Sequence, residues 1–429
     1  MIRLKKKGII FLSIFGFFVC FIWAFIYTSL GLKIISTVLE KTVPEIKIAH
    51  LDGALYDLEM RGFSLNMEGI SVEVDQATLA ISGMCLLQGK LCIKDFSADN
   101  IKVDIDTSKM ASTDENVEPV EDSGERSTID MPIPIELRAL DLENVDVRVD
   151  DMQFALDSFI GKAIWIKHEL TIFPSSAQGV KAIFSDNPAP APVAETAKSN
   201  VPLEQQIQAL FTEPLLAELP TVNIPLDINV IELTGTNWLL HMGDDFRFND
   251  VLIQARTKNS YVAIDKLNTN TETPFENGNV AVNGYINLAK QWPLNVTLQV
   301  DTKAKSQLIN TVLKANVKGA LLGTVNATAS MAGDNQLQLD ASINMIEKYL
   351  PLKLNLKGSH VQWPLQGKPE YQLNQFSVNY EGKIHDYKLD GTGLIQGESI
   401  PDTNFSLGAK GHNSGFNIDH VLAQFPQGQ

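Results

Sequence analysis

Two of the three cysteines, Cys85 and Cys92, are close enough in sequence to react with each other. They flank the segment Leu86-Leu87-Gln88-Gly89-Lys90-Leu91, which predicts a hairpin turn. In an oxidising compartment a disulfide would close this turn, and two free thiols are the alternative. A zinc site would need more ligands than two cysteines, and no histidine lies near them in sequence. We expect the third cysteine, Cys20, to pack against apolar neighbours rather than to react.

The seven histidines are scattered, and none stands in the HExxH spacing that binds zinc on a helix. The chain also has no GxSxG nucleophile elbow and no phosphate-binding loop. The glycine-rich run Gly391–Gly397 is one residue too long for a dinucleotide fingerprint, and no helical pattern follows it. The sequence therefore predicts a protein that is not an enzyme, with no catalytic residue, no cofactor and no metal site.

The charge balance narrows the class of partner. The chain has 51 acidic and 35 basic residues, a net charge of −16. An acidic surface repels phosphate backbones, so we expect no nucleic-acid partner. Apolar residues make up 44% of the 429-residue chain, which is enough to form a large apolar face.

Residues 8–30 contain no charged side chain and predict a transmembrane anchor. About 20 apolar residues in a helix cross a hydrocarbon core of ~30 Å. Basic residues cluster in positions 1–7, so we expect these to form a cytoplasmic tip and the rest of the chain to lie across the membrane. A cleaved signal peptide is the alternative, but Phe25 to Leu30 make a poor cleavage site. The predicted membrane-spanning side chains are Ile9, Phe11, Leu12, Phe17, Phe18, Val19, Phe21, Ile22 and Trp23.

Residues 31–44 predict a short amphipathic helix at the membrane surface, because apolar residues recur there at helical spacing until Pro44. From residue 45 onward the period changes to two, as in Ile101–Asp106 and Leu352–Lys357, which is typical of strands with one apolar and one polar face. Two segments interrupt this pattern. We expect flexible loops at residues 107–131, which are acidic, and at residues 185–203, which are rich in proline.

The regular part of the chain alternates Leu, Val and Ile with Asn, Thr, Ser and Lys, and pairs such as Asn283-Gly284 and Glu381-Gly382 predict turns. A sheet with one apolar face can fold onto a second sheet, close into a barrel or curl into an open trough. The pattern alone favours an ordinary sandwich core over the trough. If a trough forms, its predicted lining is Val280, Val282, Ile286, Leu288, Val296, Leu298, Val300, Leu337, Leu339, Leu352, Leu354 and Leu356.

Several short segments, in this order and spacing, resemble one known family. They include Leu51-Asp52-Gly53, the Cys85 and Cys92 pair, Asn100–Met110, Trp292-Pro293-Leu294, Trp363–Gly367 and His385–Leu389. The chain resembles the N-terminal portion of the TamB family. Its members are AsmA-like inner-membrane subunits of the bacterial translocation and assembly module.

The resemblance implies a mainly β protein. An elongated, curled amphipathic sheet over residues 45–429 would form an apolar periplasmic groove, or β-taco, after one N-terminal transmembrane helix. It also implies single-pass anchoring in the bacterial inner membrane and transport of phospholipid toward the outer membrane. Such proteins support outer membrane protein assembly and autotransporter biogenesis together with a TamA-like outer membrane barrel. We expect contact with that barrel to need a C-terminal region that this chain lacks. The alternative function is a non-transporting assembly scaffold for outer membrane β-barrel proteins.

Overall fold

The computed structural model describes residues 45–54, 56–109, 128–184, 212–272, 277–303, 310–365, 367–412 and 415–425, with Thr28, Ser29, Leu32, Val43 and Leu308. The predicted cytoplasmic tip, all nine predicted membrane-spanning side chains and the loop at 185–203 lie outside these residues. So do most of the juxtamembrane helix at 31–44 and most of the loop at 107–131. In the part of the chain that is described, no helix is both long and apolar enough to span a membrane.

The chain is mainly β, as the alternation predicts. Between residues 45 and 425, the described helical segments are α3 (Gly83–Leu86) and a 3-10 turn at Thr107–Lys109. The strands divide between two compact units. The first contains residues 1–186 and 225–245, and the second contains residues 187–224 and 246–429.

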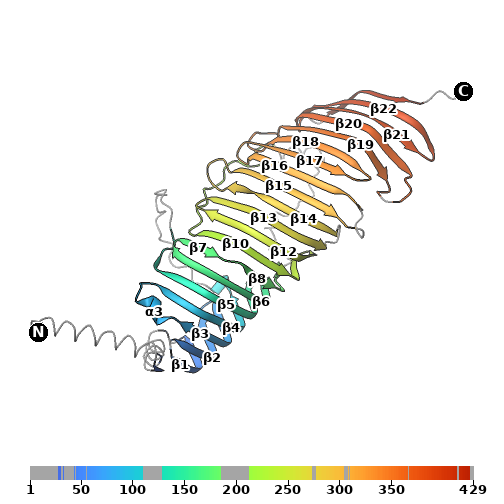
Figure 1. Ribbon diagram of the computed structural model, residues 1–429. Helices are drawn as coiled ribbons and strands as arrows, with labels where there is room; N and C mark the ends of the chain where they lie inside the picture. The colour runs from blue at the N-terminus through green and yellow to red at the C-terminus, as the bar shows by residue number, and fades with distance from the viewer. Residues whose placement is uncertain are drawn as a thin grey trace, which may run out of the picture. The chain divides into compact units, whose positions relative to one another are not determined.

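The first unit begins with an antiparallel meander (Figure 1). It consists of β1 (Ile46–Ala54), β2 (Asp57–Met67), β3 (Ile70–Ile81) and β4 (Leu91–Ile105), each paired with the next. β5 (Met131–Val149) then pairs with β4 in parallel, and β6 (Met152–Lys167) is antiparallel to β5. Three short strands line the far side of β6, namely β7 (Glu169–Ile172), β8 (Ser175–Gln178) and β9 (Lys181–Ile183).

The chain returns to this unit as β10 (Asp227–Thr236) and β11 (Trp238–Met242). β10 runs parallel to β7 and β8, and β11 runs parallel to β9. Parallel strands need a crossover connection of about a dozen residues or more. The two segments that the sequence predicts as loops coincide with the two connections, between β4 and β5 and between β9 and β10. The sequence analysis did not predict the parallel pairing of the strands that these connections join.

The second unit is a run of antiparallel neighbours, each strand paired with the one that follows it in sequence (Figure 1). Its strands are β12 (Asp244–Lys258), β13 (Tyr261–Glu272), β14 (Asn277–Asn287), β15 (Pro293–Thr302), β16 (Val312–Ala320), β17 (Thr324–Ala332), β18 (Gln336–Asn344), β19 (Leu352–Trp363), β20 (Tyr371–Lys383), β21 (Asp386–Gly397), β22 (Ile400–His412) and β23 (Gly415–Gln424).

Two of the predicted turns are wrong. Asn283-Gly284 lies inside β14, and Glu381-Gly382 lies inside β20. Gly284 has φ +148°, and a Cβ on it would lie 2.3 Å from the Asn295 carbonyl oxygen of the next strand. Glycine here permits a close approach of two strand backbones within the sheet, so the residue does not end the strand.

Aromatic rings on the apolar face of the second unit lie over glycines of neighbouring strands. The Phe376 side chain, only 6% exposed, covers Gly358 of the adjacent strand β19, where an added Cβ would lie 2.2 Å from the ring. Phe405 covers Gly393 in the same way. The ring fills the space that the missing side chain leaves and so supplies one of the few buried apolar groups in this unit.

We predict that Gly358→Ala destabilises the second unit by about 1–3 kcal/mol, because the new methyl group must displace the buried Phe376 ring. Chemical unfolding followed by circular dichroism measures the difference. The matched control is Gly391→Ala on β21, two strands away, where the nearest atoms to the new Cβ lie 4.0 Å away. Equal stability of the two variants would contradict the proposed packing.

Candidate functional site

The apolar side chains of the second unit stand opposite one another across successive strands. One row of paired residues runs from Val282 through Leu298, Ala315, Ala329 and Leu339 to Leu356 and Val378. A second row runs from Val296 through Val317, Ala327, Ala341 and Leu354 to Tyr380. Residues that face each other directly in a pair lie on the same side of a sheet. The strand register therefore places these apolar side chains on one continuous face of the sheet.

Eleven of the twelve residues predicted to line a trough lie in these strands. Six of them stand in the two rows, and the other five, Val280, Ile286, Val300, Leu337 and Leu352, pair with residues outside the rows. Leu288 is the exception, since it follows the end of β14; its backbone N–H donates to the Ser260 carbonyl. None of the twelve is fully buried. Leu298 is 37% exposed, and the others are half-buried. Side chains between two packed sheets would be buried, so this face is not the interior of a tight sandwich.

The opposite face of the same strands is polar and carries its own cross-strand bonds. The Asn316 amide donates to Asn295 Oδ1 at 2.9 Å and to Thr297 Oγ1 at 3.0 Å. Lys353 pairs with Glu381 at 3.3 Å, and Asn355 hydrogen bonds to Asn379. These contacts connect neighbouring strands from the polar side.

Two hollows in this unit lie on the polar face. One, of about 250 Å³, is lined by residues of β15 to β18 such as Lys314, Thr328 and Asp340. The other, of about 620 Å³, is lined by residues of β17 to β20 such as Gln338, Lys357 and Ser377. The sequence analysis predicted neither hollow, because the lining residues come from several strands and form no motif.

Tyr380 and Tyr387 mark the apolar face on β20 and β21. Their rings stack with centroids 5.0 Å apart, and the Tyr380 hydroxyl donates to the Lys383 carbonyl. Loss of hydration, followed by repulsion from Tyr387, raises the pKa of the Tyr380 hydroxyl. A neutral phenol is therefore the form favoured on this surface.

The first unit has an apolar face of the same kind. Phe63, Val74, Ile101, Val145 and Leu156 stand opposite one another in successive strands from β2 to β6. The row crosses the parallel pair of β4 and β5 without interruption. The parallel crossover therefore preserves the face that the antiparallel meander begins.

A hollow of about 580 Å³ lies among charged side chains of β3 to β5 in this unit. At its edge, Lys109 pairs with Asp106 at 2.7 Å. The hydrogen bond from Lys109, aided by one from Ser108, lowers the pKa of the Asp106 carboxyl to about 2. The Asp106 carboxyl therefore remains ionised in any physiological medium.

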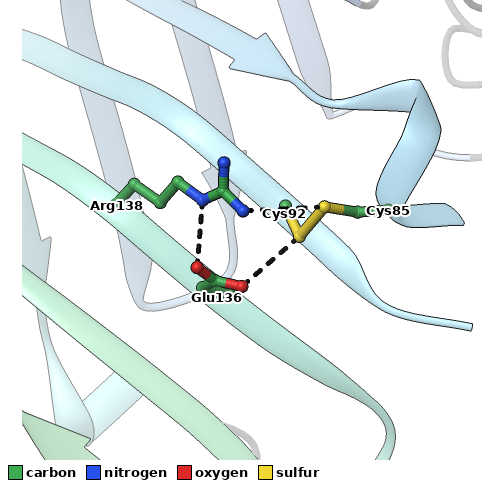
Figure 2. Close-up of a disulfide and its surroundings, with 4 residues drawn as sticks. All are labelled: Cys85, Cys92, Glu136 and Arg138. Carbon is green, nitrogen blue, oxygen red and sulfur yellow. Dashed lines mark hydrogen bonds and ion pairs between the residues drawn. A yellow bond between two sulfur atoms is a disulfide. The ribbon is translucent and has the colours of Figure 1, made fainter. Parts of the chain in front are cut away.

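The structure pairs Cys85 with Cys92 in a disulfide, with the Cα atoms 5.8 Å apart (Figure 2). The connection between β3 and β4 contains the one-turn helix α3 before the turn, rather than the simple hairpin turn predicted. Across the parallel pair, Glu136 on β5 lies opposite Cys92. Arg138 Nε donates to Glu136 Oε1 at 3.0 Å, and its guanidinium also points at Cys85 Sγ, 3.8 Å away (Figure 2). The disulfide therefore anchors the β3–β4 connection beside the first parallel crossover.

Comparison with known proteins shows similarity to one family. A family model described as "TamB, N-terminal domain" matches residues 18–429. The translocation and assembly module subunit TamB of Haemophilus influenzae is 21% identical over 400 residues. This alignment covers 89% of the present chain and 30% of that protein, so the chain spans less than a third of its relative. No solved structure matches the chain.

We predict that replacing both Cys85 and Cys92 by serine lowers the free energy of unfolding of the first unit by about 2 kcal/mol, the value expected for a short closed loop. Thermal unfolding with and without reductant measures this, and reductant should destabilise the wild-type chain but not the double variant. In the control variant Cys20→Ser, the effect of reductant should be unchanged. A double variant as stable as the oxidised wild type would contradict a structural role for the bond.

Proposed function

We propose, from the premise that the chain belongs to the TamB family through its N-terminal domain, that its apolar face carries phospholipid acyl chains from the inner toward the outer membrane. The family resemblance predicted from the sequence is confirmed, and the remaining steps are our proposal. In it, residues 8–30 anchor the chain in the inner membrane, and the strands lie in the periplasm as a groove. The chain would serve a translocation and assembly module, with a TamA-like outer membrane barrel as its partner.

The observation that carries this proposal is the half-exposed apolar face of the second unit. Monomeric soluble proteins rarely leave contiguous apolar patches of large area uncovered, and such patches mark binding or interaction surfaces. Here the apolar rows cross strand after strand, and none of the predicted lining residues is buried. An acyl chain would cover this surface with a gain of about 0.8 kcal/mol for each methylene removed from water.

The mechanism is passive. Acyl chains meet identical chemistry at each step along the rows, because Leu, Val and Ala succeed one another without a polar side chain between them. A uniform surface holds a lipid without trapping it at one position. The zwitterionic or charged headgroup remains in water at the margin of the sheet, since its transfer onto the apolar face would cost several kcal/mol. No residue acts as a catalyst, and the direction of net movement must come from elsewhere.

The alternative is a non-transporting scaffold that templates strands of outer membrane barrel proteins. The observation that favours it is the free edge of β1, which in the described residues pairs only with β2. An open edge offers unpaired N–H and C=O groups to an added strand. The two functions use different parts of the sheet, so one experiment can separate them.

We predict that a photocrosslinking amino acid at Leu339 or Leu354 captures phospholipid in cells. The same group at the neighbouring polar positions Gln338 and Lys353 should capture little, because those side chains lie on the opposite face. Mass spectrometry of the adducts measures the difference. Equal lipid capture at both sets of positions would contradict binding of lipid to the apolar face. Capture of nascent barrel proteins from the exposed β1 position Lys47, with no lipid at Leu339, would favour the scaffold.

We also predict that Leu354→Arg reduces lipid capture at Leu339 by about tenfold or more. A penalty of 1.4 kcal/mol suffices for this factor, and an unpaired charge beside acyl chains costs at least that much. The control is Lys353→Arg on the same strand, which keeps the charge of the polar face. Both variants are first compared with the wild type by circular dichroism. Undiminished capture in a folded Leu354→Arg chain would contradict acyl passage along this apolar face, where Leu354 and Leu339 stand in adjacent rows.

A further inference from the structure

Four side chains from three separate segments of the first unit meet beside the β6–β7 turn. His168 is the one residue between β6 and β7, Glu169 begins β7, and Asp227 begins β10. Asp130 immediately precedes β5. The ligand atoms of His168, Glu169 and Asp227 all lie within 4.8 Å of one another. The sequence predicted no metal site, because these residues are separated along the chain and form no motif.

The backbone of this region fixes the cluster. β7 and β10 are parallel, and their register places Asp227 directly opposite Glu169. The Asp227 N–H donates to the His168 carbonyl at 2.8 Å. The Ile129 N–H donates to the Pro225 carbonyl at 3.1 Å, which holds the start of β5 close to the start of β10. The side chains therefore converge because main-chain pairing holds their positions.

A further contact orients the imidazole. His168 Nδ1 lies 3.0 Å from Asp130 Oδ1, and the Thr128 hydroxyl donates to the other oxygen of the same carboxylate at 2.9 Å. An ionised carboxylate only accepts hydrogen bonds, so in this contact the imidazole nitrogen is the donor. With Nδ1 engaged by Asp130, Nε2 is the ring nitrogen left for a metal ion.

An imidazole held by a carboxylate through one nitrogen, with the other free to bind, is the usual arrangement of a metal-ligating histidine. We propose that His168, Glu169 and Asp227 bind one divalent transition-metal ion, with Zn²⁺ the best fit, and that Asp130 positions His168. Zinc accepts nitrogen and carboxylate oxygen at about 2.0–2.2 Å, and three protein ligands leave a fourth position for water. Two such ligand atoms on one ion lie at most about 4.2 Å apart, so small side-chain rotations close the site.

The choice of metal follows from the donors. Mg²⁺ and Ca²⁺ prefer oxygen-only sites, whereas an imidazole nitrogen favours zinc and its neighbours in the transition series. The three carboxylates, set against the single charge of the adjacent Lys167, give the cluster a negative charge that attracts a cation. A bound ion would link the start of β7 to the start of β10, at the point where the second crossover rejoins the sheet.

The test is direct titration of the full-length, tag-free chain in detergent with Zn²⁺ against a chromophoric competitor. We expect one ion per chain, with binding weakened at least tenfold by His168→Gln, Glu169→Gln or Asp227→Asn. Asp130→Asn should weaken binding by about 10- to 100-fold, as loss of an orienting carboxylate does. Zinc should also raise the unfolding temperature of the wild type and not that of the ligand variants.

The matched control is His241→Gln. His241 Nδ1 pairs with Asp245 at 2.7 Å in the same unit, but the described residues offer no group of three ligands around it. Circular dichroism checks that each variant is folded, and Glu169→Gln, which alters an exposed side chain, serves if His168→Gln is not. Absence of stoichiometric binding to the wild type overturns the proposal. Equal weakening by His241→Gln and His168→Gln, or Ca²⁺ binding that is indifferent to His168→Gln, also overturns it.

Discussion

The structure depends on cross-strand register. In each unit the apolar residues occupy alternate positions of a strand, so a slip of one residue would move every apolar side chain to the polar face. The pairs Leu339 with Leu356 and Val296 with Val317 show how the alternation of one strand meets that of the next. Because few side chains are buried, hydrogen bonds between backbones and contacts between adjacent strands carry most of the stability. Each strand of the second unit is supported by its neighbours, as in a repeat protein.

An apolar face that is left uncovered makes such a sheet prone to aggregation. The polar face limits this cost, because Asn316, Lys353 and their partners bond across strands and remain in water. Charges of both signs on that face keep it solvated, and the chain as a whole carries a net charge of −16. The aromatic rings over Gly358 and Gly393 add local packing on this face of the sheet. A surface that is costly to maintain and continuous over many strands fits the proposed role in binding lipid.

The sequence was informative wherever structure is local. Strict alternation in segments such as Val296–Val300 predicted strands, which the structure contains, and the proximity of Cys85 and Cys92 predicted a bond that the structure forms. It was uninformative wherever partners are distant. Nothing in the sequence of β4 or β5 distinguishes a parallel from an antiparallel neighbour. In both kinds of pairing, apolar and polar residues alternate along the strand in the same way. The turns predicted at Gly284 and Gly382 were wrong for a physical reason. Glycine also permits two strand backbones to approach closely within a sheet.

The cluster at His168 was not predicted from the sequence for the same reason, because its members are distant along the chain. Its members are contributed by the starts of β5, β7 and β10, and only the two crossovers bring those three starts together. A crossover lets a chain leave a sheet and return in parallel, but the cost of closing the connection must be offset at the point of return. The backbone bonds from Ile129 and Asp227 supply part of that compensation, and an ion held by side chains of both segments would add to it. The geometry that makes this region hard to predict from sequence is thus the geometry that assembles the proposed ligands, while the apolar rows pass through the unit undisturbed.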